Sequence, residues 1–192
     1  LMCAARAGAA EVVTALLDHG GGANQDILDN EGNSALHIAA GIQRRESVAI
    51  INLLLDSSSG GGASSSSSSQ INATNGDDST PLLLASFVEA HDSVIALIQR
   101  GADIEAKQRG MTALHWACWT SRKNIDDLEQ VFVLLRNGAN LEAVGADDEF
   151  TPLHYASLAG TDLALARLLL CCGADVYAPT IHGATPLQSA CM

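Results

Sequence analysis

The chain has 192 residues, of which 47% are hydrophobic and 17% are charged, proportions that are ordinary for a soluble folded protein. Its 22 acidic and 10 basic residues leave a net charge of −12, with no basic stripe to bind nucleic-acid phosphates. No apolar run reaches the roughly 20 residues of a membrane-spanning helix, so we expect neither a nucleic-acid ligand nor a membrane span. The excess of carboxylates either serves solubility or favours a basic partner.

One short pattern returns along the whole chain. It begins with serine or threonine, has leucine in third place and ends with histidine in three copies, at residues 34–37, 80–83, 112–115, 151–154 and 185–188. The chain opens at Leu1 in the same register. A glycine-alanine pair followed by asparagine or aspartate trails the pattern, at residues 22–24, 101–103, 138–140 and 173–175. Both markers recur at steps near 33 residues, which indicates an array of structural repeats.

The markers divide the chain, in order, into repeats at residues 1–33, 34–79, 80–111, 112–150, 151–184 and 185–192, of which the first and last are partial. Serine or threonine before an apolar run, with proline next in some copies, predicts the start of a first helix. An apolar stripe closed by glycine predicts a second helix, which in the first repeat covers residues 11–19. Two repeats carry insertions. The Ser/Gly tract at 57–69 should be a disordered loop. The extra polar residues within 120–128 should form a surface loop or an extended helix start.

The two markers together resemble the ankyrin repeat, and the resemblance covers essentially all of the chain. It implies an all-α solenoid over residues 1–192, built from stacked helix-turn-helix units with connecting β-hairpin loops. It also implies a non-catalytic module that presents a concave groove and hairpin tips to a protein partner. Asp78 and Glu149 stand where the family usually has glycine, so the hairpin tips there are placed only to within a residue.

The first helix of each repeat should have two distinct faces. Counting Thr151 as zero, positions two, five, six and nine fall together at 100° per residue, and their small or apolar residues predict the face between repeats. Positions four, seven and eight lie opposite, on the face that lines the groove in this family. At position four, Trp116 and Tyr155 fit the core better than a contact. At position seven, Trp119 and Phe87 fit either role equally well.

The resemblance places partner contacts on the groove face and at the hairpin tips. We expect the site to be centred on the third to fifth repeats, where an apolar stripe lies under the hairpins and acidic residues border it. Aromatic and arginine side chains are the usual anchors of such surfaces. The candidate contact residues are Phe87, Arg109, Met111, Trp119, Thr120, Asp147, Asp148, Phe150, Leu158, Ile181 and His182.

Other side chains that could carry chemistry have structural interpretations. His37, His115 and His154 recur at repeat spacing, and the resemblance implies that each bridges backbone groups of neighbouring repeats rather than binding a metal ion. The five cysteines include no Cys-x-x-Cys pair and have apolar neighbours, so we expect reduced, buried thiols and an intracellular location, in the cytoplasm or nucleus. The sequence has no phosphate-binding glycine loop, nucleophile elbow or zinc helix, so we expect no enzyme, cofactor or metal.

The leading interpretation is therefore a protein–protein interaction module, whose partner has a basic surface if the acidic rim takes part. The alternative is the targeting or regulatory arm of a larger enzyme, such as a kinase, ubiquitin ligase or acyltransferase. A standalone metal-dependent enzyme is a poor third. We expect a monomer, with association possible through end faces where incomplete repeats leave inter-repeat surface exposed.

Overall fold

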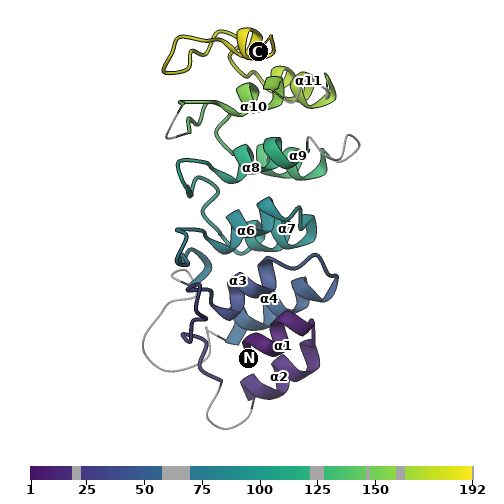
Figure 1. Cartoon of the computed structure of the whole chain (residues 1–192). Coiled ribbons are helices and arrows are strands. Elements are labelled where there is room, and N and C mark those ends of the chain that lie inside the picture. Colours follow the sequence, from purple (N-terminus) through teal and green to yellow (C-terminus); the bar gives the residue numbers. More distant parts are fainter. Residues whose placement is uncertain (19–22, 58–69, 122–127, 146–147, 159–162, 192) are drawn as a thin grey trace. The chain divides into compact units, whose positions relative to one another are not determined.

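A computed structural model describes every residue of the chain outside the ranges 19–22, 58–69, 122–127, 146–147, 159–162 and 192. The described residues form two compact units, Leu1–Asp103 and Ile104–Met192 (Figure 1). Within the described ranges every regular element is a helix, and the strand-like pairing is an isolated bridge between Gln108 and Met111. The predicted all-α class is confirmed.

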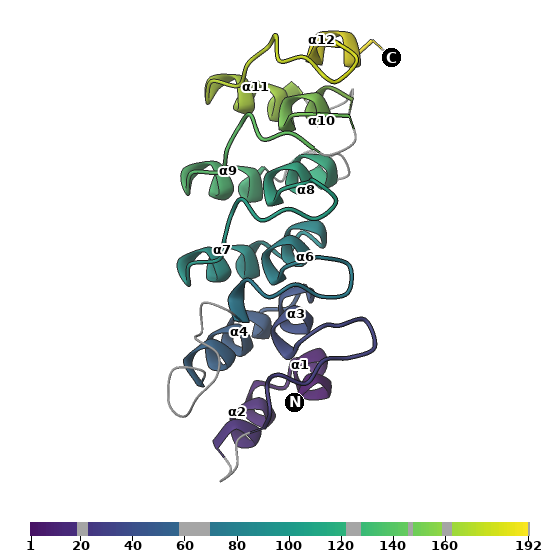
Figure 2. The same ribbon diagram turned by 90° about the vertical axis from the view of Figure 1, so that its left-hand side faces the viewer.

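The first unit is built from pairs of short helices. Its helices are α1 (Met2–Ala7), α2 (Ala10–Asp18), α3 (Ala35–Ala40), α4 (Glu46–Ser57), α6 (Pro81–Phe87) and α7 (His91–Gln99). Within a repeat the two helices pack on each other, as α3 does on α4. Between repeats, first helices contact first helices and second helices contact second helices, so that α3 packs on α6 and α4 on α7 (Figure 2).

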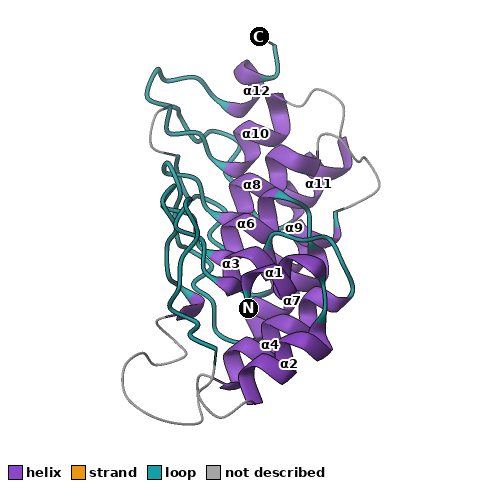
Figure 3. Cartoon of the chain, turned by 60° about the horizontal axis from the view of Figure 1, so that its bottom comes forward, coloured by secondary structure: helices purple, strands orange, loops and turns teal. Residues whose placement is uncertain are grey.

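The second unit repeats this arrangement. Its helices are α8 (Ala113–Thr120), α9 (Glu129–Arg136), α10 (Pro152–Leu158), α11 (Leu163–Cys171) and α12 (Pro186–Ser189). The first helix α10 packs between α8 and α12, and it also contacts its own second helix, α11. In each unit the connecting loops gather on one side of the helices, next to the first helices of the repeats (Figure 3).

The core of each unit follows the predicted helix faces. In the first unit Ile50, Ile51 and Leu97 are fully buried, and in the second Leu114 and Leu165 are. Burial of one such aliphatic side chain contributes about 1.5–3 kcal/mol. At position five of the first helices, the alanines have no exposed surface and let neighbouring helices approach closely; they are Ala39, Ala85 and Ala117.

Local chemistry sets the helix starts. Ser34, Thr80 and Thr185 are extended N-cap residues whose hydroxyls accept the backbone N–H three residues on, as expected for such caps. Proline occupies the first helical position of α6 and α12, where its missing N–H costs no hydrogen bond. The helix predicted at 11–19 is observed as α2, Ala10–Asp18.

The insertions differ slightly from prediction. Ser57 is the last residue of α4, so the Ser/Gly tract is shorter than predicted, and residues 58–69 lie outside the described part. In the fourth repeat α8 continues through Thr120, so the predicted loop begins later, and most of it falls in residues 122–127, which also lie outside the described part.

Hairpin loops of successive repeats contact each other through their backbones. In the first unit the N–H of Gly76 donates to the carbonyl of Glu31 over 2.9 Å. A Cβ atom on Gly76 would lie 2.7 Å from that same oxygen, so only glycine fits without a shift of the backbone. In the second unit the N–H of Ile181 donates to the carbonyl of Asp148 over 3.2 Å.

Candidate functional site

The recurring histidines join the first helix of a repeat to the segment that ends the same repeat and leads into the next. Each accepts a hydrogen bond at Nδ1 from the backbone N–H of the serine or threonine three residues earlier, over 3.1–3.2 Å. Since an amide N–H can only donate, the proton of each neutral ring lies on Nε2. From there His37 donates to the carbonyls of Ala73 and Ser79, His115 to Phe150 and His154 to Ala184. The predicted bonds from the histidines to backbone groups are confirmed, but the acceptors lie at the end of the same repeat rather than in a neighbouring one.

Burial keeps two of these rings neutral. Desolvation lowers the pKa of His115 to about 4, although its hydrogen bonds to backbone carbonyls act in the opposite direction. Desolvation likewise lowers the pKa of His37, again against its bonds to carbonyls. A neutral ring is needed for the bridge, because Nδ1 must keep its lone pair for the N-cap N–H.

In the second unit, aromatic contacts among the described residues link His115 and His154 to Trp119. The ring of Tyr155 on α10 meets Trp119 edge to face at 5.9 Å, Phe150 at 5.5 Å and His115 at 5.6 Å. Phe150 also stacks on His154 at 5.4 Å, with the ring planes 13° apart. Such pairs add about 0.5–1.5 kcal/mol each beyond area burial. We call Trp119, Tyr155 and Phe150 the aromatic row.

The side chains of the aromatic row are partly exposed, whereas the histidine rings that they contact are buried. Trp119 near the end of α8 is 40% exposed, Phe150 and Tyr155 are partly exposed, and Leu158 at the end of α10 is also partly exposed. His115 and His154 behind them are buried. The row therefore presents apolar surface on a rigid base, which is the form that an interface anchor needs.

The hairpin residues predicted as contacts are exposed in varying degree. Arg109 is exposed in the turn between Gln108 and Met111, with φ of 50°, and Met111 is partly buried. Asp148 is exposed, while its carbonyl holds the next hairpin at Ile181. Ile181 is 58% exposed, and the neighbouring His182 is also exposed.

Three residues predicted as partner contacts do not lie on the exposed surface of the second unit as the structure describes it. Thr120 is only 4% exposed, and its hydroxyl donates to the carbonyl of Ala117, so it belongs to the packed helix end rather than to a contact surface. Asp147 lies outside the described residues. Phe87 is 51% exposed at the end of α6, in the first unit, whereas the other described candidates lie in the second unit.

The prediction of buried thiols was wrong for four of the five cysteines. Cys118 alone is buried, and burial raises its pKa. The exposed thiols belong to Cys3, Cys171, Cys172 and Cys191. Apolar neighbours in sequence did not predict burial. Cys171 is the last residue of α11 and Cys172 comes directly after it, and both thiols are exposed there.

Tyr155 was missed as part of the candidate surface. Its position on the helix suggested core, but it is only partly buried and contacts both Trp119 and Phe150. The available signal was its spacing: Tyr155 and Trp119 occupy positions four and seven of neighbouring first helices, which share a face.

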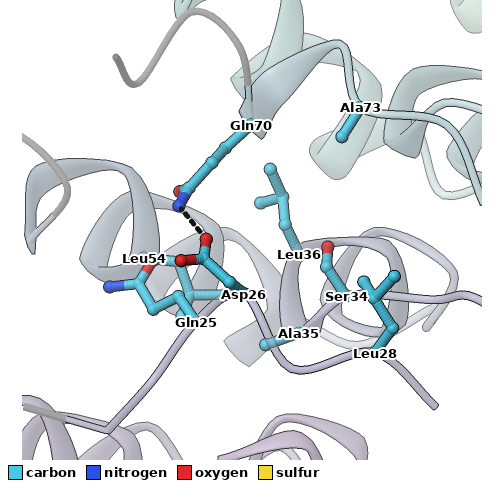
Figure 4. A pocket seen from close by; sticks show the side chains of 9 residues that line it. All are labelled: Gln25, Asp26, Leu28, Ser34, Ala35, Leu36, Leu54, Gln70 and Ala73. Carbon is cyan, nitrogen blue, oxygen red and sulfur yellow. Dashed lines mark hydrogen bonds between the residues drawn. The ribbon is translucent and has the colours of Figure 1, made fainter. Parts of the chain in front are cut away.

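The first unit has charged residues near its hairpins and a cavity. Hydrogen bonds from the backbone N–H of Asn33 lower the pKa of the Asp29 carboxyl, which also lies 3.8 Å from Arg6. The N–H of Gly76 in the next hairpin donates a hydrogen bond to Glu31 in the same hairpin as Asp29. The cavity has a volume of about 140 Å³ (Figure 4) and is lined by Gln25, Asp26, Leu28, Ser34, Ala35, Leu36, Leu54, Gln70 and Ala73.

The described residues also bear on metal binding and membrane insertion. Among the residues that the structure describes, no three histidine, cysteine, aspartate or glutamate side chains are grouped so that they could hold a metal ion. The helices of the described part are also all too short or too polar to cross a membrane.

The helix pairs, the recurring histidines and the exposed aromatic row are features of a repeat module for protein–protein interaction. The family model for ankyrin repeats in three copies matches residues 1–64 and 42–128, and the model for a single ankyrin repeat matches residues 148–181. The chain belongs to the ankyrin-repeat family.

Known relatives agree with this assignment. The chain is 34% identical over 143 residues to the human Neurogenic locus notch homolog protein 2, covering 73% of this chain and 5% of that protein. It is 32% identical over 188 residues to human Rabankyrin-5, covering 96% of this chain and 14% of that protein. Both matches thus span a small part of a much longer relative.

A solved structure shows the same fold. The crystal structure of the ankyrin repeat domain of Bcl-3, described as a unique member of the IkappaB protein family, superposes with a TM-score of 0.80. The two sequences are 32% identical, and the match covers 98% of this chain and 76% of that one.

Proposed function

We propose that this chain is a non-catalytic module that binds a protein partner through the aromatic row of its second unit. The observation that carries the proposal is the exposure of Trp119, which presents 40% of its surface although it sits on a rigid base of Tyr155 and buried histidines. Large aromatic side chains in such settings dominate binding energy because they bury much area with little ordering cost.

The hairpin residues extend this surface. Arg109 and Met111 come from the turn before α8, and Asp148 and Phe150 from the loop before α10. Ile181 and His182 continue it at the next hairpin, and Leu158 extends the apolar face. Phe87 would serve as a contact of the first unit. Asp148, together with Asp147, would favour a basic partner rim and raise the association rate more than the affinity.

The test compares two exposed aromatic residues of the second unit. Trp119→Ala removes the proposed anchor, and Phe132→Ala removes a phenylalanine of α9 that is 54% exposed and outside the row. Partners are captured from extracts of the source cells with the wild-type chain, and their affinities are measured by calorimetry. We expect Trp119→Ala to weaken binding by about 2 kcal/mol or more, and Phe132→Ala to leave it nearly unchanged.

Stability must be measured beside affinity. Because Trp119 is partly exposed, its truncation should cost about 1–2 kcal/mol of unfolding free energy, less than the roughly 3–5 kcal/mol of a fully buried tryptophan. A loss in the larger range would assign Trp119 to the core. Equal affinity of wild type and Trp119→Ala would remove the aromatic row from the interface.

The dependence of the association rate on ionic strength tests whether the partner has a basic surface. If the acidic rim steers association, raising the ionic strength from 0.05 to 0.5 M should slow association and leave dissociation almost unchanged. An association rate independent of salt would leave the acidic residues with a solubility role only.

A second function is favoured by the lengths of the relatives. Because the chain matches only 14% of Rabankyrin-5 and 5% of the notch homolog, the same module can serve inside a longer protein, including as the targeting or regulatory arm of an enzyme. The full reading frame distinguishes this possibility from a separate scaffold. In either setting we place the module inside the cell, in the cytoplasm or nucleus, and treat it as a monomer, which sedimentation equilibrium tests directly.

A further inference from the structure

The cavity of the first unit lies beside Gln25. Gln25 lies nine residues before Ser34, and Ile71 lies nine residues before Thr80. In the next repeat Ile71 is only 2% exposed. Gln25 instead turns its amide away and donates to the hydroxyl of Ser57 over 2.7 Å. Gln25 therefore lines a cavity at the register position where the next repeat buries an isoleucine.

The walls of the cavity suit an apolar guest. Leu36 and Leu54 lie at its base with Ala35 and Ala73, and Leu28, which is 56% exposed, forms one edge (Figure 4). The volume of about 140 Å³ is close to that of an engineered apolar cavity of about 150 Å³ that binds benzene. A leucine, isoleucine or methionine side chain fits this space.

The rim is polar on one side. The amide of Gln70 donates to the carboxylate of Asp26 over 3.5 Å, a long hydrogen bond, and the other carboxylate oxygen of Asp26 faces away from Gln70 (Figure 4). Asp26 is exposed and can accept a further hydrogen bond from a backbone N–H or a basic side chain. An apolar base beside a carboxylate acceptor fits a peptide segment better than a wholly apolar molecule.

The neighbouring segment of the chain cannot supply this guest. Residues 58–69 precede Gln70 directly in sequence and contain only serine, glycine and alanine, none of which has a branched or long aliphatic side chain. We propose that the cavity between Gln25 and Gln70 binds one aliphatic side chain of a protein partner, next to a hydrogen-bond donor that Asp26 accepts. This site belongs to the first unit and does not depend on the aromatic row of the second unit.

The test uses blocked amino acids as probes. N-acetyl-leucine-N-methylamide and its alanine counterpart are titrated into the 15N-labelled full chain, and amide shifts are followed by NMR. We expect saturable shifts at Leu28, Leu36 and Ala73 with the leucine probe, and an affinity at least about tenfold lower for the alanine probe. Shifts that do not saturate, or that are equal for both probes, would overturn the proposal.

Variants at one position separate a filled cavity from an open one. Gln25→Leu puts an aliphatic side chain where Ile71 lies in the next repeat, so it should lower the affinity for the leucine probe at least about tenfold. Gln25→Ala widens the cavity and should keep or raise that affinity. If Gln25→Leu does not fold, Gln25→Ala alone decides, and a weaker affinity in that variant contradicts the proposal. Asp26→Asn should weaken binding while leaving the preference for leucine over alanine intact.

Discussion

Acid should destabilise the second unit through His115, whose neutral ring joins the start and the end of its repeat. The ring accepts the N–H of Thr112 at Nδ1 and donates from Nε2 to the carbonyl of Phe150 over 3.0 Å. Protonation of Nδ1 would place two donors opposite each other. Burial lowers the pKa of His115 from 6.5 to about 4, so the folded chain resists this protonation.

The sign and size of the effect follow from linkage. Between pH 6.5 and 4 the unfolded chain binds a proton at His115 and the folded chain does not, so the unfolding free energy falls as pH falls. The contribution is fully present above pH 6.5. At 1.36 kcal/mol per pH unit, the interval down to about 4 corresponds to a loss of about 3 kcal/mol. The lowered pKa of His37 acts in the same direction in the first unit.

Urea unfolding between pH 7.5 and 4 measures this loss. Trp116 and Trp119 are the two tryptophans of the chain and both lie in α8 with His115, so tryptophan fluorescence reports on this repeat. His115→Gln removes the titrating group. In α12 glutamine already occupies the equivalent place, where Gln188 accepts the N–H of Thr185 over 2.8 Å.

We expect His115→Gln to lose about 1–3 kcal/mol at pH 7.5, because the bond to Phe150 is weakened, and to show a flatter pH dependence than wild type. His182→Gln, at an exposed histidine, is the matched control and should retain the wild-type slope. If wild type and His115→Gln lost stability equally between pH 6.5 and 4, the argument from a buried neutral ring would be refuted.

Three further predictions concern other parts of the chain. Gly76→Ala should cost about 1–3 kcal/mol because its Cβ would meet the Glu31 carbonyl, whereas Gly145→Ala, with neighbours at 3.7 Å, should change stability little; equal costs in urea unfolding would contradict the close approach of the hairpins. Deleting residues 58–69 should change the unfolding free energy by less than about 1 kcal/mol, since loop closure costs only about 0.6 kcal/mol per doubling of length, and a loss above about 2 kcal/mol, the scale of a core defect, would show that the tract packs. A thiol reagent should modify Cys3, Cys171, Cys172 and Cys191 in the native chain and Cys118 only after denaturation; early reaction of Cys118 would show that α8 opens locally.

Sequence alone determined the features of this protein that depend on neighbours along the chain. The serine and threonine caps, the prolines at helix starts and the glycines after second helices act within a few residues. Their recurrence near every 33 residues was sufficient to predict helix pairs, and the resemblance to the ankyrin repeat implied the bonds from His37, His115 and His154 to backbone groups.

Tertiary structure decided which side chains remain accessible, because exposure depends on residues far away in sequence. Trp119 and Thr120 are adjacent, yet one is 40% exposed and the other 4%. Tyr155 joined the aromatic row through contacts with Trp119 and Phe150, and four cysteines beside apolar residues proved to be exposed. The cavity beside Gln25 could not be predicted from the sequence either. Leu54 and Gln70 belong to the following repeat, and only the folded structure shows that they line the cavity together with Gln25.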